Sequence, residues 1–343
     1  MTVNEKYKCQ LCSRQAELVY KKFPGYQEPD LYDIYYCSNC DTSFSSPKDD
    51  SKSIYDLIYK YGDTVPGYSR YWNYSKSIAG VEKPLSFLAE KEEAYWGVRE
   101  SLSRFVLDNK EAEILEIGSG LGYLTYALRK EGYNCHGLEI SSDAVKSANA
   151  SFGNYYYCHD LFEYSILNSG FYDIVILTEV IEHLTDPITF IESAIKLLKP
   201  EGKIIITTPN KSIYPASYYW ETDLPPVHFW WFSEKSMHAL AGKMGLNIEF
   251  INFSGFYKRN TKTLNLNQIL DKDSKKSVFN KYGELLIKDL SNKKSHRNTI
   301  KDVVFKIPYF KTIYLKTRNL IDSKLILAGR KSIILCVILS QKS

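Results

Sequence analysis

The chain has 343 residues, of which 44% are hydrophobic and 24% charged, as expected of a globular protein with a sizeable buried core. Residues 1–20 contain no apolar signal-peptide segment, and the run SIILCVILS near the end is too short to cross a bilayer. These features argue against a signal peptide and against a transmembrane helix, so we expect a cytoplasmic protein.

The small net charge of +4 conceals a basic C-terminal block. Residues 256–343 hold 20 Lys and Arg against 6 Asp and Glu, whereas the rest of the chain is acidic. Such a block attracts anions, for example a nucleotide-linked substrate, nucleic acid or lipid headgroups. The alternative is a solvated helical surface without a specific partner.

Residues 1–50 contain two CxxC pairs, CQLC and CSNC, whose cysteines can close one tetrahedral thiolate site. In a cytosolic chain this pattern favours a metal over disulfides, and we expect structural zinc bound by Cys9, Cys12, Cys37 and Cys40. So small a unit would fold only with its metal. The other three cysteines lie in strand-like segments and are expected in the core: Cys135, Cys158 and Cys336.

Residues 51–110 have a helical pattern, are rich in Tyr and Trp, and are expected to form a connector or lid. Strands and helices then alternate through a core at 111–258. The predicted strands are EILEI, CHGLEI, YYYCHD, YDIVILTEV, GKIIITTPN and LNIEFINFSG. Helices are predicted over GYLTYALRKEG, over SDAVKSANA with Ser141 or Ser142 as its cap, from Asp186-Pro187 onward, and over SEKSMHALAGKMG.

This alternation predicts an α/β fold with a doubly wound parallel sheet covered on both faces. Residues 259–331 interrupt the rhythm with Lys-rich, weakly helical sequence, and residues 332–343 supply one last strand. The basic block is therefore predicted to be an insertion before the final strand.

The first strand leads into ILEIGSGLGYL, where glycines at 118, 120 and 122 let the backbone pass close to a ligand. The dinucleotide pattern G-x-G-x-x-G fails because its sixth position is Tyr123, and no triphosphate-binding G-x-x-x-x-G-K-[ST] is present. The arrangement E-x-G-x-G-x-G resembles motif I of the class I S-adenosylmethionine-dependent methyltransferases. The resemblance covers about residues 85–258 and the last strand.

That resemblance implies a Rossmann-like, mostly parallel seven-stranded sheet whose last strand runs antiparallel beside the fifth. It also implies S-adenosylmethionine as cofactor, with Glu139 on the ribose hydroxyls, Asp160 facing the adenine amino group, and Glu179 bordering the methionine end. The full predicted set is Glu116, Gly118, Ser119, Gly120, Gly122, Glu139, Ile140, Asp160, Leu161 and Glu179. The paired CxxC motifs resemble a zinc ribbon carried by one branch of these enzymes, many of which act in sugar or natural-product pathways.

The segment TEVIEHL follows the fourth strand and resembles the E-H-L segment of ubiquinone-biosynthesis-type methyltransferases. His183 is the predicted general base, because an imidazole titrates near neutral pH. Glu182 could orient His183 or help hold a divalent cation. The alternative is that His183 only stabilises the corner after the strand.

A second candidate, His228, lies in the long segment from Pro209 to Ser233, which resembles the P-P-x-H-x-x-x-F-S stretch of related methyltransferases. His228 could approach the acceptor. Four aromatic side chains could stack on a sugar or aromatic ring, or simply bury the segment: Trp220, Phe229, Trp230 and Trp231.

The leading hypothesis is methyl transfer to a hydroxyl of a small molecule, such as a sugar nucleotide or a polysaccharide or natural-product intermediate. A carbon or nitrogen acceptor is also compatible. An RNA methyltransferase, using the ribbon and the basic block for recognition, is less favoured because the ribbon interleaves its few cations with acids. Intact glycines and acidic residues argue against a non-catalytic scaffold, and a homodimer is compatible with the sequence.

Overall fold

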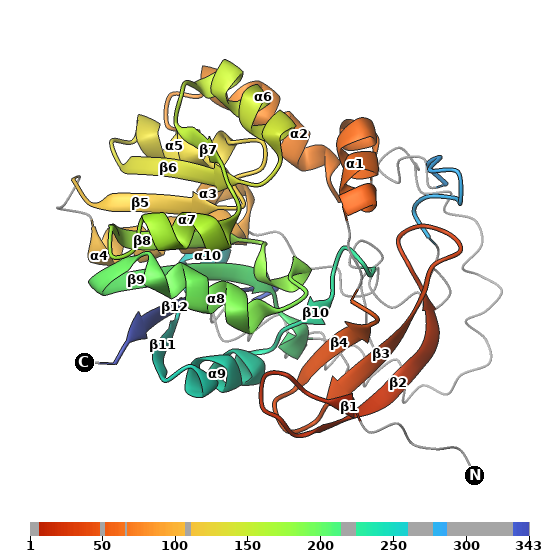
Figure 1. The fold of residues 1–343 in the computed structure, drawn as a ribbon. Helices are drawn as coiled ribbons and strands as arrows, with labels where there is room; N and C mark the ends of the chain where they lie inside the picture. Colours follow the sequence, from red (N-terminus) through yellow and green to blue (C-terminus); the bar gives the residue numbers. More distant parts are fainter. Residues whose placement is uncertain are drawn as a thin grey trace, which may run out of the picture.

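The computed structural model describes residues 7–48, 52–65, 67–106, 111–213, 224–259, 277–286 and 332–342. In these segments the chain forms two β-sheets, one of five strands and one of seven, with helices packed around the larger sheet (Figure 1). No helix among the described residues has the length and hydrophobicity needed to cross a membrane.

The five-stranded sheet holds the two CxxC turns. Its strands run in the order β1-β2-β3-β4-β10, and every neighbouring pair is antiparallel. Four of the strands are N-terminal: β1 (Tyr7–Lys8), β2 (Gln15–Pro24), β3 (Leu31–Cys37) and β4 (Thr42–Ser46). The fifth, β10 (Trp230–Trp231), comes from the long segment after β9. We call residues 7–48 the ribbon.

Four helices connect the two sheets: α1 (Lys52–Tyr61), α2 (Ser69–Ser77), α3 (Pro84–Lys91) and α4 (Glu93–Phe105). Helix α4 has the apolar spacing of an amphipathic helix, and its buried face includes Val98 and Leu102. Helix α1 buries Ile54 and Ile58 in an apolar cluster that also contains ribbon residues.

The seven-stranded sheet has the order β11-β12-β9-β8-β5-β6-β7. Its strands are β5 (Glu113–Ile117), β6 (Asn134–Glu139), β7 (Tyr156–Cys158), β8 (Tyr172–Thr178), β9 (Leu198–Pro209), β11 (Leu246–Phe250) and β12 (Ile334–Gln341). The pairs among β5 to β9 are parallel, and β12 is antiparallel to both β9 and β11. The predicted mostly parallel sheet and its antiparallel last strand are confirmed.

The helices around this sheet are α5 (Tyr123–Lys130), α6 (Ser142–Phe152), α7 (Leu161–Leu167), α8 (Pro187–Lys196), α9 (Glu234–Lys243) and α10 (Ser254–Arg259). Ser141 caps α6 and Asp186 caps α8, as predicted. Helix α7 was not predicted from the sequence. It begins directly after Asp160, whose carboxylate accepts hydrogen bonds from its first backbone amides.

Both faces of the sheet are buried, so its central strands alternate between two apolar clusters. Val175 and Leu177 pack into one cluster, whereas Ile174 and Ile176 pack into the other. This accounts for the continuous apolar run of β8 in the sequence. Cys135 and Cys336 are buried as predicted, but Cys158 is exposed. That prediction was wrong because Cys158 ends the edge strand β7, where only Tyr156 is buried.

A third apolar cluster joins the ribbon to the rest of the chain. It contains Tyr26 and Ile34 of the ribbon, Ile58 of α1, and Val227 of the segment before β10. Phe279 belongs to the same cluster, and its backbone amide donates to the carbonyl of Tyr26 at 3.0 Å. Of the predicted insertion at 259–331, the structure describes residue 259 and residues 277–286.

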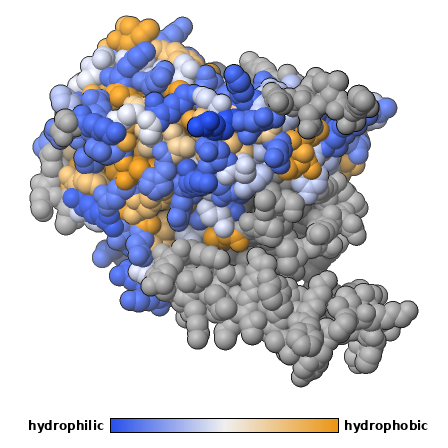
Figure 2. All heavy atoms as spheres, turned by 90° about the horizontal axis from the view of Figure 1, so that it is seen from below, coloured by the Kyte–Doolittle hydropathy of each residue, from blue (hydrophilic) through white to orange (hydrophobic). Residues whose placement is uncertain are grey.

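Figure 2 shows one face of the molecule, on which the hydrophobic residues form separate small patches among hydrophilic ones. Large apolar side chains that remain exposed include Phe162, Ile166, Leu167 and Phe171 around α7.

Candidate functional site

The turn between β5 and α5 is built on glycines that other residues could not replace without strain. Gly118 and Gly122 have φ values of +72° and +79°, in the left-handed region. A Cβ on Gly122 would lie 2.7 Å from the Cβ of Ala148, and one on Gly118 would lie 2.8 Å from a methyl group of Val180. The backbone therefore turns tightly at the carboxyl end of β5, where open α/β sheets bind ligands.

Glu139, at the end of β6, is held against this turn. One carboxylate oxygen accepts a hydrogen bond from the backbone amide of Gly120, and the other accepts from Ser141, each at 2.9 Å. The neighbouring Ile140 is 72% exposed, although it is a large apolar residue. An exposed isoleucine beside an anchored carboxylate suits the contact with the cofactor that the sequence predicts for both residues.

Replacing Glu139 with Gln is expected to weaken S-adenosylhomocysteine binding about 10- to 100-fold, because hydrogen bonds to a charged group are stronger than those to a neutral amide. Isothermal titration calorimetry measures this effect. The matched control is Asp143→Asn, since the Asp143 carboxylate lies in the next helix with 93% of its side chain exposed. Equal affinities of both variants and the wild type would contradict the role of Glu139.

Asp160 and Leu161 follow β7 along the same edge of the sheet. One oxygen of Asp160 accepts from the amides of Phe162 and Glu163, at 2.7 and 3.4 Å, and so caps α7. Leu161 is buried. Asp160 therefore has a structural role in α7 in addition to the adenine contact that the sequence predicts.

Glu116 and Ser119 are the buried polar residues of the glycine turn. The carboxyl group of Glu116 accepts a hydrogen bond from the hydroxyl of Thr125 on α5. Burial raises the pKa of Glu116 from 4.5 to about 8. The side chain thus fixes the strand to the following helix, and it holds a proton over most of the neutral pH range.

This raised pKa predicts a pH-dependent contribution to stability. The carboxyl group of Glu116 binds its proton more tightly in the folded state than in the unfolded state. Its stabilising contribution to the free energy of unfolding is therefore complete below pH 4.5 and is lost as pH rises through about 8. Glu116→Gln, which mimics the protonated form, should show a flatter dependence of unfolding free energy on pH between these values. Urea unfolding at several pH values tests this, and parallel curves for the variant and the wild type would refute it.

The corner after β8 carries the predicted acid–base residues. Glu179 has φ of +54°, which is unusual for a residue with a side chain and often marks a functional site. Residues Ile181–His183 then form one turn of 3-10 helix. Glu182 is 1% exposed, and its carboxylate accepts a hydrogen bond from the hydroxyl of Thr208 on β9 at 2.9 Å.

The imidazole of His183 is oriented by a backbone carbonyl. Its Nδ1 lies 2.6 Å from the carbonyl oxygen of Val227. A carbonyl can only accept, so Nδ1 carries the proton and the neutral ring has its lone pair on Nε2. This Nε2 lies 3.9 Å from the second carboxylate oxygen of Glu182. The arrangement gives His183 a defined tautomer with the basic nitrogen next to a buried carboxylate.

His228 lies against His183 although the two are far apart in sequence. Their rings pack edge to face with centroids 4.6 Å apart. Burial lowers the pKa of His228 to about 3, so its imidazole is neutral at physiological pH. The structure thus brings together Glu182, His183 and His228, whose ligand atoms lie within 4.8 Å of one another and could hold a metal ion.

Two tyrosines of α1 also face this region and were not predicted as site residues. The ring of Tyr55 packs edge-on against His183, with centroids 6.1 Å apart. The hydroxyl of Tyr59, one turn later, lies 3.9 Å from the position of a Cβ on Gly120. One face of α1 therefore spans from His183 to the glycine turn. The i,i+4 spacing of tyrosines signals a common face, but the sequence does not reveal what that face covers.

The described aromatic residues of the segment before α9 do not form an open platform for stacking on a substrate. They bury the segment instead, which was the other alternative. Phe229, Trp230 and Trp231 are all buried, because β10 pairs with β4 of the ribbon. Trp230 packs against Phe44 with ring centroids 5.3 Å apart. Trp220 lies outside the described residues.

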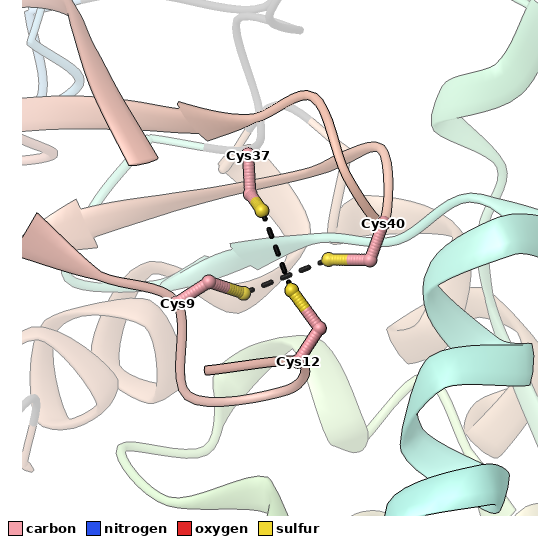
Figure 3. A group of neighbouring side chains, drawn as sticks. All are labelled: Cys9, Cys12, Cys37 and Cys40. Atoms are coloured by element: carbon pink, nitrogen blue, oxygen red, sulfur yellow. Dashed lines mark hydrogen bonds between the residues drawn. The ribbon is translucent and has the colours of Figure 1, made fainter. Parts of the chain in front are cut away.

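The four cysteines of the ribbon point toward a common centre (Figure 3). The Sγ atoms of Cys9 and Cys40 are 3.6 Å apart, and those of Cys12 and Cys37 are 3.5 Å apart. A disulfide would require about 2.05 Å. A tetrahedral zinc site with bonds of about 2.3 Å places its sulfurs about 3.8 Å apart. The donor set and spacing therefore fit a four-thiolate zinc site.

Comparison with known proteins places this geometry in context. Residues 90–249 match the family described as methyltransferase domain. The ubiquinone biosynthesis O-methyltransferase of Vibrio campbellii is 26% identical over 158 residues, which cover 42% of this chain and 60% of that protein. That of Xanthomonas oryzae is 27% identical over 155 residues, covering 44% and 59%. The chain thus spans about three fifths of the length of these curated relatives.

Among solved structures, an S-adenosylmethionine-dependent methyltransferase from Archaeoglobus fulgidus aligns with a TM-score of 0.41 and 18% identity. The alignment covers 71% of this chain and 93% of that one.

Proposed function

We propose that this chain, whose residues 90–249 are a class I S-adenosylmethionine-dependent methyltransferase domain, methylates a hydroxyl group of a small molecule, with His183 as the general base. The observation that carries this proposal is the hydrogen bond from His183 Nδ1 to the carbonyl of Val227. This bond fixes the tautomer whose lone pair is on Nε2, and a general base needs such a lone pair to take a proton.

S-adenosylmethionine supplies a methyl group on a positively charged sulfur, which an acceptor attacks directly. We assign the binding of this cofactor to the turn at Gly118–Gly122 with Glu116 and Ser119, to Glu139 and Ile140, to Asp160 and Leu161, and to Glu179. The tight turn and the anchored carboxylate of Glu139 support the assignment, because both lie at the carboxyl edge of the parallel sheet.

In the proposed reaction, the acceptor oxygen would bond to the methyl carbon as the bond from that carbon to the sulfonium sulfur breaks, which would release S-adenosylhomocysteine. Nε2 of His183 would take the proton of the acceptor hydroxyl. The imidazolium that results is stabilised by the carboxylate of Glu182, 3.9 Å away. The carbonyl of Val227 keeps the ring in position throughout. His228, neutral and packed against His183, orients the ring and lines the acceptor side.

An oxygen acceptor is supported by the names of the matched relatives, which are O-methyltransferases. We propose a sugar nucleotide or a polysaccharide or natural-product intermediate as the acceptor class. The basic block at 256–343 supports an anionic acceptor, since its excess of Lys and Arg would attract a diphosphate.

We further propose that the ribbon binds one structural zinc ion through Cys9, Cys12, Cys37 and Cys40. The spacing of the four sulfurs supports this, and thiolate ligands imply a reducing compartment such as the cytoplasm. Inductively coupled plasma mass spectrometry of the purified protein should find one zinc per chain. Metal-free protein with a folded ribbon would refute the proposal.

The test of function is to incubate the zinc-loaded protein with methyl-labelled S-adenosylmethionine and fractionated host extract, beside His183→Ala. Label in a nucleotide-linked or saccharide fraction, and its loss in the variant, is the expected result. Label in RNA or protein would overturn the small-molecule proposal. Label on carbon or nitrogen of a small molecule would overturn only the hydroxyl assignment.

A further inference from the structure

We infer that the ribbon positions the acceptor side of the site, and that it does so through residues 227–231. The inference rests on the proposed role of His183. It gives the ribbon a function beyond binding its own metal: the ribbon holds in place the carbonyl that fixes the His183 tautomer and the imidazole of His228.

The backbone of Phe229 forms the link. Its amide donates to the carbonyl of Glu182 at 2.9 Å, and its carbonyl accepts from the amide of Ser45 on β4 at 2.9 Å. One peptide segment therefore connects the ribbon directly to the corner that carries Glu182 and His183. His228 immediately precedes this residue, and Val227 precedes His228.

The contact continues along β10. Trp231 accepts a hydrogen bond on its carbonyl from the hydroxyl of Thr42, which is fully buried, at 3.2 Å. On the other side, the indole nitrogen of Trp230 donates to the carbonyl of Leu184 at 2.8 Å. The segment is thus bound to the ribbon along one edge and to the E-H-L corner along the other.

Two further contacts hold the ribbon against the core. Lys211, which is 3% exposed, forms an ion pair with Asp41 at 2.9 Å between nitrogen and oxygen. Its backbone amide donates to the carbonyl of Phe232, directly after β10. Val227 itself packs in the cluster that contains Tyr26 and Ile34 of the ribbon. Because Lys211 is buried, separating it from Asp41 would leave the charge of the lysine uncompensated.

The cofactor side is built differently. The hydrogen bonds that anchor Glu139 run to Gly120 and Ser141, within the seven-stranded sheet and its own loops. Loosening the ribbon from β10 should therefore disturb His183 and His228 while leaving the affinity for the cofactor almost unchanged.

Two variants separate the ribbon from residues 227–231. Ser45→Pro removes the backbone amide that donates a hydrogen bond to the carbonyl of Phe229. Because this amide points toward Phe229 and away from β3, the hydrogen bonds between β4 and β3 are kept. Thr42→Val removes the hydroxyl bonded to Trp231 with little change in shape. The matched control is Ser103→Ala, which deletes a hydroxyl-to-carbonyl bond within α4.

The measurements use full-length, zinc-loaded protein. Amides of residues 227–231 should exchange with solvent about 10-fold faster in both variants, as expected for the loss of one buried hydrogen bond. The imidazole nitrogen resonances of His183 and His228, assigned with His183→Gln and His228→Gln, should shift. Affinity for S-adenosylhomocysteine should stay within about two-fold of the wild type.

Unchanged exchange and unchanged histidine resonances in both variants would overturn the inference. A loss of S-adenosylhomocysteine affinity well beyond about two-fold would also overturn the inference, because the ribbon would then act on the whole domain and not on His183 and His228 alone. If His183→Ala retains full turnover, the proposed base fails, whereas the exchange and resonance data still decide whether the ribbon positions these residues.

Discussion

Replacing His183 with Gln is expected to lower turnover about 10²-fold or more, with little effect on cofactor affinity. Glutamine keeps much of the size and polarity of the side chain but cannot accept a proton from the acceptor. In the wild type, the carbonyl of Val227 orients the imidazole and the carboxylate of Glu182 lies next to Nε2. In the variant, both groups would face a side chain that does not titrate. Single-turnover kinetics with labelled S-adenosylmethionine and saturating acceptor measure the chemical step directly.

The matched control is His238→Gln, because His238 is an exposed histidine of α9 whose ring lies against Phe250 of β11. Its turnover should equal that of the wild type. Near-normal turnover of His183→Gln would reduce the residue to a structural role at the corner.

Cys40→Ser is expected to abolish zinc binding and to lower the thermal midpoint by about 10 °C or more. Tyr26 and Ile34 of the ribbon pack in the third apolar cluster with residues outside the ribbon, and the buried Phe44 packs on Trp230. Loss of the metal would therefore weaken the third apolar cluster as well as the cysteine site. Differential scanning calorimetry with zinc analysis of the same samples measures both effects.

Cys158→Ser is the matched control, since Cys158 is an exposed cysteine outside the ribbon. It should retain zinc and its thermal midpoint. A Cys40→Ser protein that melts like the wild type would show that the ribbon is stable without a four-thiolate metal site.

Much of the fold could be predicted because its signals are local. The apolar run of β8 and the capping residues Ser141 and Asp186 each act within a few positions of the chain. The glycines at 118 and 122 mark a turn that only glycine adopts readily. The antiparallel last strand was predicted from a resemblance and not from any local signal.

The candidate site was predicted less completely, because its contacts are between distant segments. His183 and His228 were each identified from nearby motif residues, but no sequence pattern indicates that Val227 bonds to His183. The buried rings of Trp230 and Trp231 could equally have formed a platform, and the pairing of β10 with β4 decided between these outcomes. Tyr55 was missed for the same reason, since a helical face does not specify what it covers.

The place of β12 in the sheet has a consequence for biosynthesis. β12 lies between β9 and β11, yet roughly 80 residues separate the end of β11 from its start. At ribosomal rates, the two neighbouring strands leave the exit tunnel roughly 4 to 16 s before the strand that joins them. During this interval each presents an open edge capable of pairing with another chain. The nascent protein is therefore most prone to aggregation late in translation, when a chaperone that shields strand edges would have its greatest effect on yield.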